Sequence, residues 1–351
     1  MAARRNPETD GAIRTGRQPQ FEVDRYLERS PSTVLLDYSA LDNATSALAR
    51  RSRDRSRFHW GLAAQAAADS HKYSAMLATG EDVGVPLALL SWVRRSHRPV
   101  FLITHGSYFA SERFGRLMRV LRRNGRLHFL CLSESLRRIL VNDFGVRPEN
   151  AHNTSYGVDT SFFHPSHRAD DPAGSGEPLI VAAGTAKRDY RTLVEAAEGL
   201  DAPVHIAADS TWFREPVNIG DREVPPNVTI RSSGDYAGLR DLYARASFVV
   251  VPLRPARHAC GYAVIVEAMA MGRAVICTKT ESPGDFLADG ETGFYVKPGD
   301  AEDLRLRMEA LLCNPELARE MGRRGRARIE REFSLDAYCD RIESVIHRNP
   351  A

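Results

Sequence analysis

Short runs of apolar and β-branched residues alternate along most of the chain with longer segments of helical periodicity. In the first half, strands are predicted at residues 33–38, 99–104 and 126–132, and helices at 109–123 and 133–144. The alternation restarts after residue 178, with strands predicted at 179–183, 204–208, 228–231, 248–251 and 274–277 and helices at 189–199, 236–246 and 262–271. Continuous apolar strands separated by helices are typical of βαβ units on buried parallel sheets. The chain is therefore predicted to be an α/β protein.

The chain is expected to form two such domains, because 351 residues exceed the usual size of one domain. Residues 163–178 hold three prolines and little to bury, which predicts an interdomain linker. The N-terminal domain then spans residues 31–162 and the C-terminal domain residues 179–333. Residues 1–30 are polar and aperiodic and are expected to be a disordered leader. Residues 334–351 are expected to form a helix that packs back on the N-terminal domain.

The composition excludes several classes of protein. No run approaches the roughly 18 apolar residues that a membrane span needs, and the first thirty residues carry charges instead of the apolar core of a secretion signal. The five cysteines never form a CxxC pair, which is typical of reduced thiols in a cytoplasmic protein. The basic residues are not interleaved with aromatic ones and belong to no nucleic-acid-binding module, so nucleic acid is not an expected partner.

Several familiar active-site motifs are missing from the sequence. The P-loop pattern, the GxGxxG turn, the GxSxG elbow, HExxH and an aspartate pair of the form DxD all fail to occur. These absences argue against a phosphate-cradling P-loop, a dinucleotide fingerprint, a serine-hydrolase elbow and an HExxH zinc site. Ligands of doubly wound sheets bind at the carboxyl ends of the strands, so the cleft between the two domains is the expected site.

One acidic residue stands inside a helix that is apolar on almost every side. Glu267 lies in the segment 262–271, and a carboxylate buried there costs several kcal/mol unless hydrogen bonds satisfy it. A vicinal diol such as a ribose would satisfy both oxygens, and so would backbone amides or an arginine in a purely structural role. The helix opens at Gly261 and Tyr262, where unpaired N–H groups and the positive end of the helix dipole can hold a phosphate.

Four stretches, taken together, resemble the retaining nucleotide-sugar glycosyltransferases of the bacterial sucrose-synthase and mannosyltransferase type, glycosyl transferases group 1. They are YGVDTSFFHP at 156–165, GTAKRDYRTLVEA at 184–196, EAMAMG at 267–272 and DGETGFYVKPGD at 289–300. The resemblance covers roughly residues 99–348. It implies the GT-B fold, in which two Rossmann-like doubly wound domains face each other across a cleft.

The resemblance also assigns roles to residues. In this family the acid of the EAMA helix holds the nucleotide ribose, which implies that role for Glu267. Basic residues after the first strand of the donor domain neutralise the diphosphate, which implies that role for Lys187 or Arg188. Thr185 stands where the family usually has arginine, and Ala259 stands where relatives with an E-x7-E motif have a glutamate that contacts the sugar. The full set of expected donor-binding residues is Gly184, Thr185, Ser232, Ser233, Cys260, Gly261, Tyr262, Ala263 and Glu267.

In the first half, His105 follows an apolar strand and is expected at its carboxyl end, facing the cleft. The family places a histidine beside the reacting sugar, which implies a catalytic role for His105; a histidine hydrogen-bonded at a strand end is the structural alternative. Glu81 and Asp82 follow a second strand-like segment and are expected to bind acceptor hydroxyls, or to form a turn and the cap of a helix.

Four arginines recur at helical spacing on the first half of the chain: Arg116, Arg119, Arg123 and Arg126. Such a row lies along one helix face and is either a solvated surface or a contact with an anionic membrane. Residues 1–160 carry a formal excess of eight positive charges, and residues 161–351 an excess of five negative ones. The asymmetry favours an anionic partner for the first half.

The sequence thus predicts a retaining hexosyl- or N-acetylhexosaminyl-transferase that moves a sugar from a nucleotide-diphosphate sugar to a hydroxyl acceptor, either a small molecule or one linked to lipid or polysaccharide. Because no DxD motif exists, no divalent metal is expected to be required. No cofactor is expected besides the nucleotide-diphosphate sugar that serves as donor substrate. The expected location is the cytoplasm, with the inner face of the membrane as an option. Two alternatives stay open: a nucleotide-sugar epimerase or hydrolase on the same fold, and a non-catalytic nucleotide-sugar-binding subunit.

Overall fold

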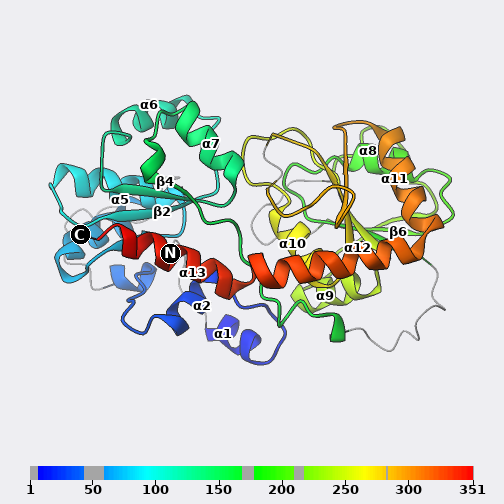
Figure 1. Ribbon diagram of the computed structural model, residues 1–351, viewed down its shortest axis with the longest axis horizontal. Helices are drawn as coiled ribbons and strands as arrows, with labels where there is room; N and C mark the ends of the chain where they lie inside the picture. Colours follow the sequence, from blue (N-terminus) through cyan, green and yellow to red (C-terminus); the bar gives the residue numbers. More distant parts are fainter. Residues whose placement is uncertain (1–6, 43–58, 168–177, 209–216, 282–283, 351) are drawn as a thin grey trace.

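The computed structural model describes residues 7–42, 59–167, 178–208, 217–281 and 284–350. Two α/β domains lie side by side along the longest axis of the molecule (Figure 1). Each is built on a parallel sheet, and together they form the GT-B arrangement, so the predicted fold class is confirmed. Within the described ranges, no helix is long and apolar enough to cross a membrane.

The N-terminal domain is built on a sheet with the sequential order β1-β2-β3-β4. Its strands are β1 (Met76–Ala78), β2 (Val100–Thr104), β3 (Leu127–Cys131) and β4 (Ala151–Asn153). Every residue of β2 and β3 is buried, which explains why both appear in the sequence as unbroken apolar runs. The helices of this domain are α4 (Trp60–Asp69), α5 (Glu81–Val93), α6 (Glu112–Leu121) and α7 (Glu134–Asn142).

The C-terminal domain contains a six-stranded parallel sheet with the order β10-β9-β8-β5-β6-β7. Its strands are β5 (Ile180–Ala183), β6 (Val204–Ala207), β7 (Val228–Ile230), β8 (Phe248–Val251), β9 (Ala274–Thr278) and β10 (Gly293–Val296). Its helices are α8 (Tyr190–Ala197), α9 (Tyr236–Arg245), α10 (Tyr262–Ala270), α11 (Ala301–Cys313) and α12 (Pro315–Arg328). The chain order reverses between β5 and β8, so a topological switch point lies there.

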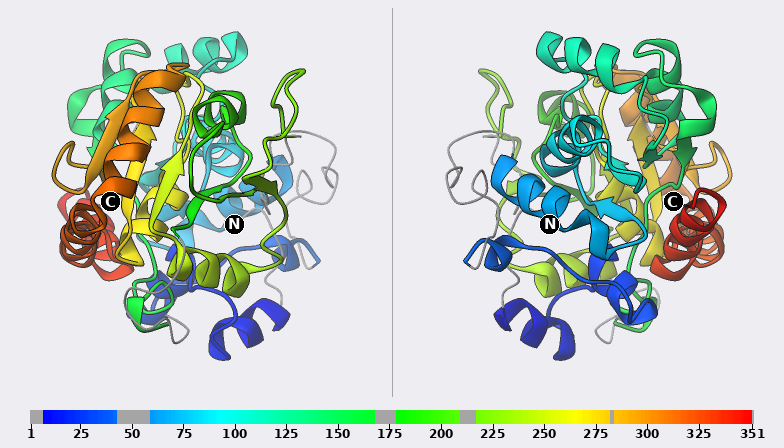
Figure 2. Two further views of the ribbon diagram at one scale, coloured as in Figure 1. Left: turned by 90° about the vertical axis from the view of Figure 1, so that its right-hand side faces the viewer. Right: turned by 90° about the vertical axis from the view of Figure 1, so that its left-hand side faces the viewer.

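Residues 7–29 correct the expectation of a disordered leader, whereas residues 1–6 lie outside the described ranges. They form α1 (Pro7–Arg14) and α2 (Glu22–Arg29). Arg25 and Arg29 of α2 pair with Asp336 and Asp340 near the end of the chain. The segment also reaches the C-terminal domain, where Arg240 donates to the Gly16 carbonyl. Figure 2 shows both helices beneath the two domains.

Residues 33–38 do not form the predicted strand. Residues 33–37 have no regular secondary structure, and the short 3-10 helix η1 (Tyr38–Leu41) follows them. The side chain of Asp37 caps η1 by accepting from the Ser39 N–H at 2.8 Å. The capping hydrogen bond of Asp37 stabilises the 3-10 helix here, in competition with a β-strand.

The end of the chain returns to the N-terminal domain. After α12 and the π-turn η5 (Ile329–Phe333), helix α13 (Leu335–Arg348) continues along the molecule to the N-terminal half (Figure 1). Ser334 bridges to Val158, and Arg341 Nε donates to the Thr154 carbonyl at 2.6 Å. Of the predicted linker, residues 168–177 lie outside the described residues.

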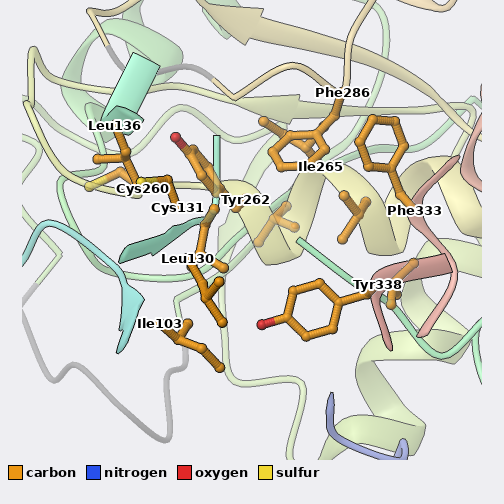
Figure 3. Close-up of a cluster of buried hydrophobic side chains, with 14 of the residues drawn as sticks. Ile103, Leu130, Cys131, Leu136, Cys260, Tyr262, Ile265, Phe286, Phe333 and Tyr338 are labelled. Atoms are coloured by element: carbon orange, nitrogen blue, oxygen red, sulfur yellow. The ribbon is translucent and has the colours of Figure 1, made fainter. Parts of the chain in front are cut away.

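One apolar core continues from one domain into the other. Figure 3 shows part of this cluster, in which Leu130 and Leu136 of the N-terminal domain lie close to Tyr262, Ile265 and Phe286 of the C-terminal domain. The Tyr262 ring packs edge-on against Phe286 at 5.0 Å between centroids. The two domains therefore share buried surface beside the cleft.

Candidate active site between the two domains

The carboxyl ends of the two sheets meet where residues from β2 and β8 touch. His105 directly follows β2, and its carbonyl accepts a hydrogen bond from the Ala259 N–H at 2.9 Å. Ala259 belongs to the loop between β8 and α10. The loop after β5 is tied to the same region, because Arg188 and Leu253 form an isolated β-bridge. The predicted donor loops thus lie together at the switch point, opposite His105.

Glu267 is the acid at the centre of this region. It is only 8% exposed, although it lies on a helix whose other residues are apolar. Tyr243 Oη of α9 donates to Glu267 Oε2 at 3.3 Å, and this is a long bond. Burial raises the pKa of Glu267 to about 7, while the Tyr243 hydrogen bond and the charge of Arg188 act in the opposite direction. Burial thus outweighs the hydrogen bond and the charge that favour the ionised form of Glu267.

The turn after β5 places a cation next to this acid. Arg188 is buried, with Nε donating to the Ala183 carbonyl and Nη1 to the Ala186 carbonyl, both at 2.8 Å. These bonds use two of its three nitrogens and leave Nη2 over Gly184. Gly184 has φ +85°, a conformation that favours glycine, and a Cβ there would lie 2.6 Å from Nη2. Thr185 is buried in the same turn, and Lys187 is half-buried with a positive φ.

The first turn of α10 completes the C-terminal side of the site. Gly261 has φ +77°, and a Cβ there would lie 2.9 Å from Val251 Cγ1, so the position requires glycine. No described side chain caps the helix, and the N–H groups of a first helical turn can donate hydrogen bonds to an anion. Cys260 is buried just before it. The Tyr262 side chain is committed elsewhere, because its hydroxyl donates to Ser133 Oγ at 2.9 Å.

Ser232 and Ser233 lie at the far side of the site. They follow β7, which is two strands away from β5 in the sheet. Ser232 Oγ accepts from the Gly234 N–H at 3.0 Å within the same turn. Their place at the carboxyl end of the sheet is compatible with contacts to the nucleotide base through the backbone.

Glu81, predicted to bind acceptor hydroxyls or to form a turn, is engaged within the protein. Glu81 is 2% exposed, and its Oε1 accepts from the Gly106 N–H at 2.6 Å. Burial raises its pKa, whereas the charge of His105 and backbone N–H groups lower it. His105 itself contacts the Thr79 carbonyl through Nε2 at 3.1 Å. Glu81 is thus a buried support of the His105–Gly106 turn and does not face the cleft.

Asp82 is likewise engaged within the protein. Its Oδ2 lies 3.1 Å from His59 Nε2, and Tyr38 Oη contacts the other nitrogen of His59. Oδ1 accepts from the Val83 N–H at 3.0 Å at the start of α5. Glu81 and Asp82 thus lie in the first turn of α5, as the structural alternative expects, and acceptor binding stays a prediction. Sequence reasoning missed the Tyr38–His59–Asp82 chain, because its members come from three separate segments.

Sequence reasoning also missed the polar contacts that join the domains. Asp285 Oδ2 accepts from the Glu134 N–H at 2.8 Å, at the beginning of α7. Arg257 pairs with Asp143 across the same boundary. Ser133 caps α7 beside the first of these contacts, and a cap residue does not reveal a partner in the other domain.

Comparisons with known proteins show that the sequence and the fold are similar to those of glycosyltransferases. Residues 166–328 match the family model described as glycosyl transferases group 1. The chain is 24% identical over 185 residues to the lipopolysaccharide core biosynthesis glycosyltransferase LpsE of Rhizobium meliloti, covering 52% of this chain and 53% of that protein. The chain spans about half the length, or less, of the first curated relatives that it matches.

Solved structures share the fold over most of the chain. A glycosyltransferase from Rickettsia africae superposes with a TM-score of 0.71 at 17% identity, covering 96% of this chain and 94% of that one. Anabaena Alr3699/HepE in complex with UDP-glucose superposes with a TM-score of 0.65 at 17% identity, covering 82% of each chain. At this level of identity the likeness establishes the two-domain fold.

Proposed function

We propose that this chain transfers a sugar from a nucleotide-diphosphate sugar to a hydroxyl acceptor with retention of configuration, because residues 166–328 match the glycosyl transferases group 1 model and the fold is GT-B. One observation carries the proposal: the buried carboxylate of Glu267 lies within electrostatic reach of Arg188 at the switch point of the C-terminal sheet. A nucleoside diphosphate has the complementary groups, a diol for the acid and a diphosphate for the cation.

In this proposal the C-terminal domain binds the donor. Glu267 accepts hydrogen bonds from the ribose hydroxyls, and the α10 N-terminus at Gly261 holds the diphosphate. Gly184 and Thr185 line the turn beside it, and backbone groups near Ser232 contact the base. Support comes from the missing side-chain cap on α10 among the described residues and from the glycine-specific geometry of Gly261.

Leaving-group stabilisation is the proposed source of the rate enhancement. Breaking the bond from the anomeric carbon to phosphate places positive charge on the sugar and additional negative charge on the diphosphate. Arg188 Nη2, the Lys187 ammonium and the α10 N–H groups can meet that negative charge as it forms, and each such donor is worth about 3 kcal/mol. His105, across the cleft, orients the sugar. The departing phosphate accepts the acceptor's proton on the same face.

The finer parts of the proposal rest on the sequence. The chain lacks a DxD pair, so we propose turnover without a divalent metal, with Arg188 and Lys187 neutralising the diphosphate instead. The sugar is a hexose or N-acetylhexosamine. The acceptor hydroxyl belongs to a small molecule or to a lipid- or polysaccharide-linked glycan. One relative is named for lipopolysaccharide core biosynthesis, which supports the second class.

The experiment is nucleoside diphosphate release from a panel of nucleotide sugars, with and without a cell extract that supplies acceptors. We expect acceptor-dependent release that survives chelation of divalent metals and falls in Glu267→Gln. Glu302→Gln, an exposed acid of α11, serves as the matched control. Release without acceptor would favour an epimerase or hydrolase, and donor binding without any release would favour a non-catalytic subunit.

A further inference from the structure

A basic hollow opens on the N-terminal domain outside the donor site. It has a volume of about 620 Å³ and lies between one face of α6 and the end of α7. Three of its lining side chains are the arginines Arg116, Arg119 and Arg122, at successive turns of one helix face. Figure 1 shows α6 and α7 side by side at one edge of this domain.

Surface arginines of this chain fall into two groups. Some pair with acids three or four residues away, as in Arg319–Glu316 and Arg305–Glu309, and others, such as the three that line the hollow, have no ion pair among the described residues. Within the described residues, none of Arg116, Arg119 and Arg122 forms an ion pair or donates a side-chain hydrogen bond. Three guanidinium groups therefore line the hollow without a protein acceptor among the described residues.

The acids in the lining do not neutralise this charge. Asp143 pairs with Arg257 of the C-terminal domain, so its charge is already compensated. Glu112 is the other acid, and it stands at the first turn of α6, where the helix dipole stabilises it. A net positive charge remains in a concave site.

A glycine in the middle of α6 keeps the hollow open. Gly115 costs the helix about 1 kcal/mol relative to alanine. Neither backbone nor packing demands it: its φ is ordinary, and an added Cβ would meet nothing closer than Phe144 Cε1 at 3.9 Å. A larger side chain at this position would instead project into the hollow that Gly115 and Phe144 line.

We propose that this hollow is a binding site for the phosphate group of a phosphate ester, separate from the donor site. Guanidinium groups are the side chains best suited to bind phosphate, because each offers a planar pair of donors. Three of them converge on one hollow of the right size for a phosphorylated headgroup or sugar. The ester is either a soluble metabolite or the headgroup of an anionic lipid, and the proposal does not depend on the donor assignment.

Arginine footprinting tests the site directly. The protein is treated with phenylglyoxal, and modification at each arginine is quantified by peptide mass spectrometry. The probes are glycerol 3-phosphate, vesicles of phosphatidylcholine with phosphatidylglycerol, and vesicles of phosphatidylcholine alone. We expect either glycerol 3-phosphate or the anionic vesicles to slow modification of Arg116, Arg119 and Arg122 by about three- to tenfold. Protection by the soluble ester identifies a soluble ligand, and protection by anionic vesicles alone identifies a lipid.

One variant and one internal control distinguish a defined phosphate site from nonspecific electrostatic attraction. Gly115→Leu fills the hollow while keeping every charge, so the protection should disappear although the protein stays folded, as circular dichroism will show. Arg123 is exposed on the same helix end but outside the lining, and its modification rate should not change. Equal protection of Arg123, persistence of protection in Gly115→Leu, or no protection by any phosphate probe would each overturn the proposal.

Discussion

The pH dependence of nucleotide binding tests the role of Glu267 in depth. The carboxyl group has a pKa of about 7 because burial disfavours its charge more than Tyr243 and Arg188 favour it. Only the ionised form accepts hydrogen bonds from both ribose hydroxyls with full strength. With that pKa, about a tenth of the protein is ionised at pH 6 and about nine-tenths at pH 8. Affinity for a nucleoside diphosphate should therefore be about tenfold lower at pH 6 than at pH 8.

Stability should move in the opposite direction. Glu267 has a higher pKa in the folded chain than the 4.5 of its ordinary environment, so the folded state holds its proton more tightly. The stability that this group contributes is fully present below pH 4.5 and is lost as pH rises through about 7. The loss amounts to about 3 kcal/mol, at 1.36 kcal/mol per pKa unit. Glu267→Gln removes this slope from urea unfolding curves measured between pH 4.5 and 8.

Isothermal titration calorimetry with UDP, GDP and ADP measures the binding side of this prediction. The nucleotide's own phosphate also titrates near pH 6, so the comparison is between wild-type protein and Glu267→Gln at each pH. We expect the tenfold difference in affinity between pH 6 and pH 8 to shrink in the variant. At pH 8 the binding free energy of the variant should be less favourable by about 1–3 kcal/mol. Identical pH profiles in the two proteins would refute the reasoning, because a carboxylate at the ribose cannot be pH-silent across its own pKa.

Three other substitutions test the surroundings of the site. Glu81→Leu leaves the buried Gly106 N–H without its acceptor and should lower the free energy of unfolding by about 1–3 kcal/mol in urea titrations, whereas Glu81→Gln should retain most of it. Gly261→Ala places a Cβ against Val251 on a residue in the left-handed conformation. It should lower the free energy of unfolding by at least about 1–2 kcal/mol in the same assay, and it should also weaken nucleotide binding. Tyr262→Phe removes one interdomain hydrogen bond and should cost about 1 kcal/mol, with nucleotide affinity at pH 8 unchanged within error.

Much of the fold was predictable because its central strands are buried on both faces. The residues of β5, β8 and β9 form unbroken apolar runs that no exposed element could carry, and the structure has strands there. The leader was not predictable in the same way. Helices α1 and α2 have eight residues each, and α2 is stabilised by pairs with Asp336 and Asp340, more than 300 positions away.

The site shows the same division. A single acid inside an apolar helix indicates a special environment from sequence alone, and Glu267 is indeed buried beside Arg188. The orientation of the Glu81 side chain could not be predicted from the sequence. Two acids after a strand can either face a cleft or belong to the capped first turn of a helix. Its contact with Gly106 depends on how β1 and β2 pair in the sheet. Periodicity carries no information about such pairings.

The most direct test of the central claim is a crystal structure of the protein with the nucleoside diphosphate that binds best in calorimetry. We predict a Glu267 carboxylate oxygen within hydrogen-bond distance of each ribose hydroxyl, and the diphosphate between Arg188 and the first turn of α10. A nucleotide bound elsewhere, or a ribose out of reach of Glu267, would contradict the proposal.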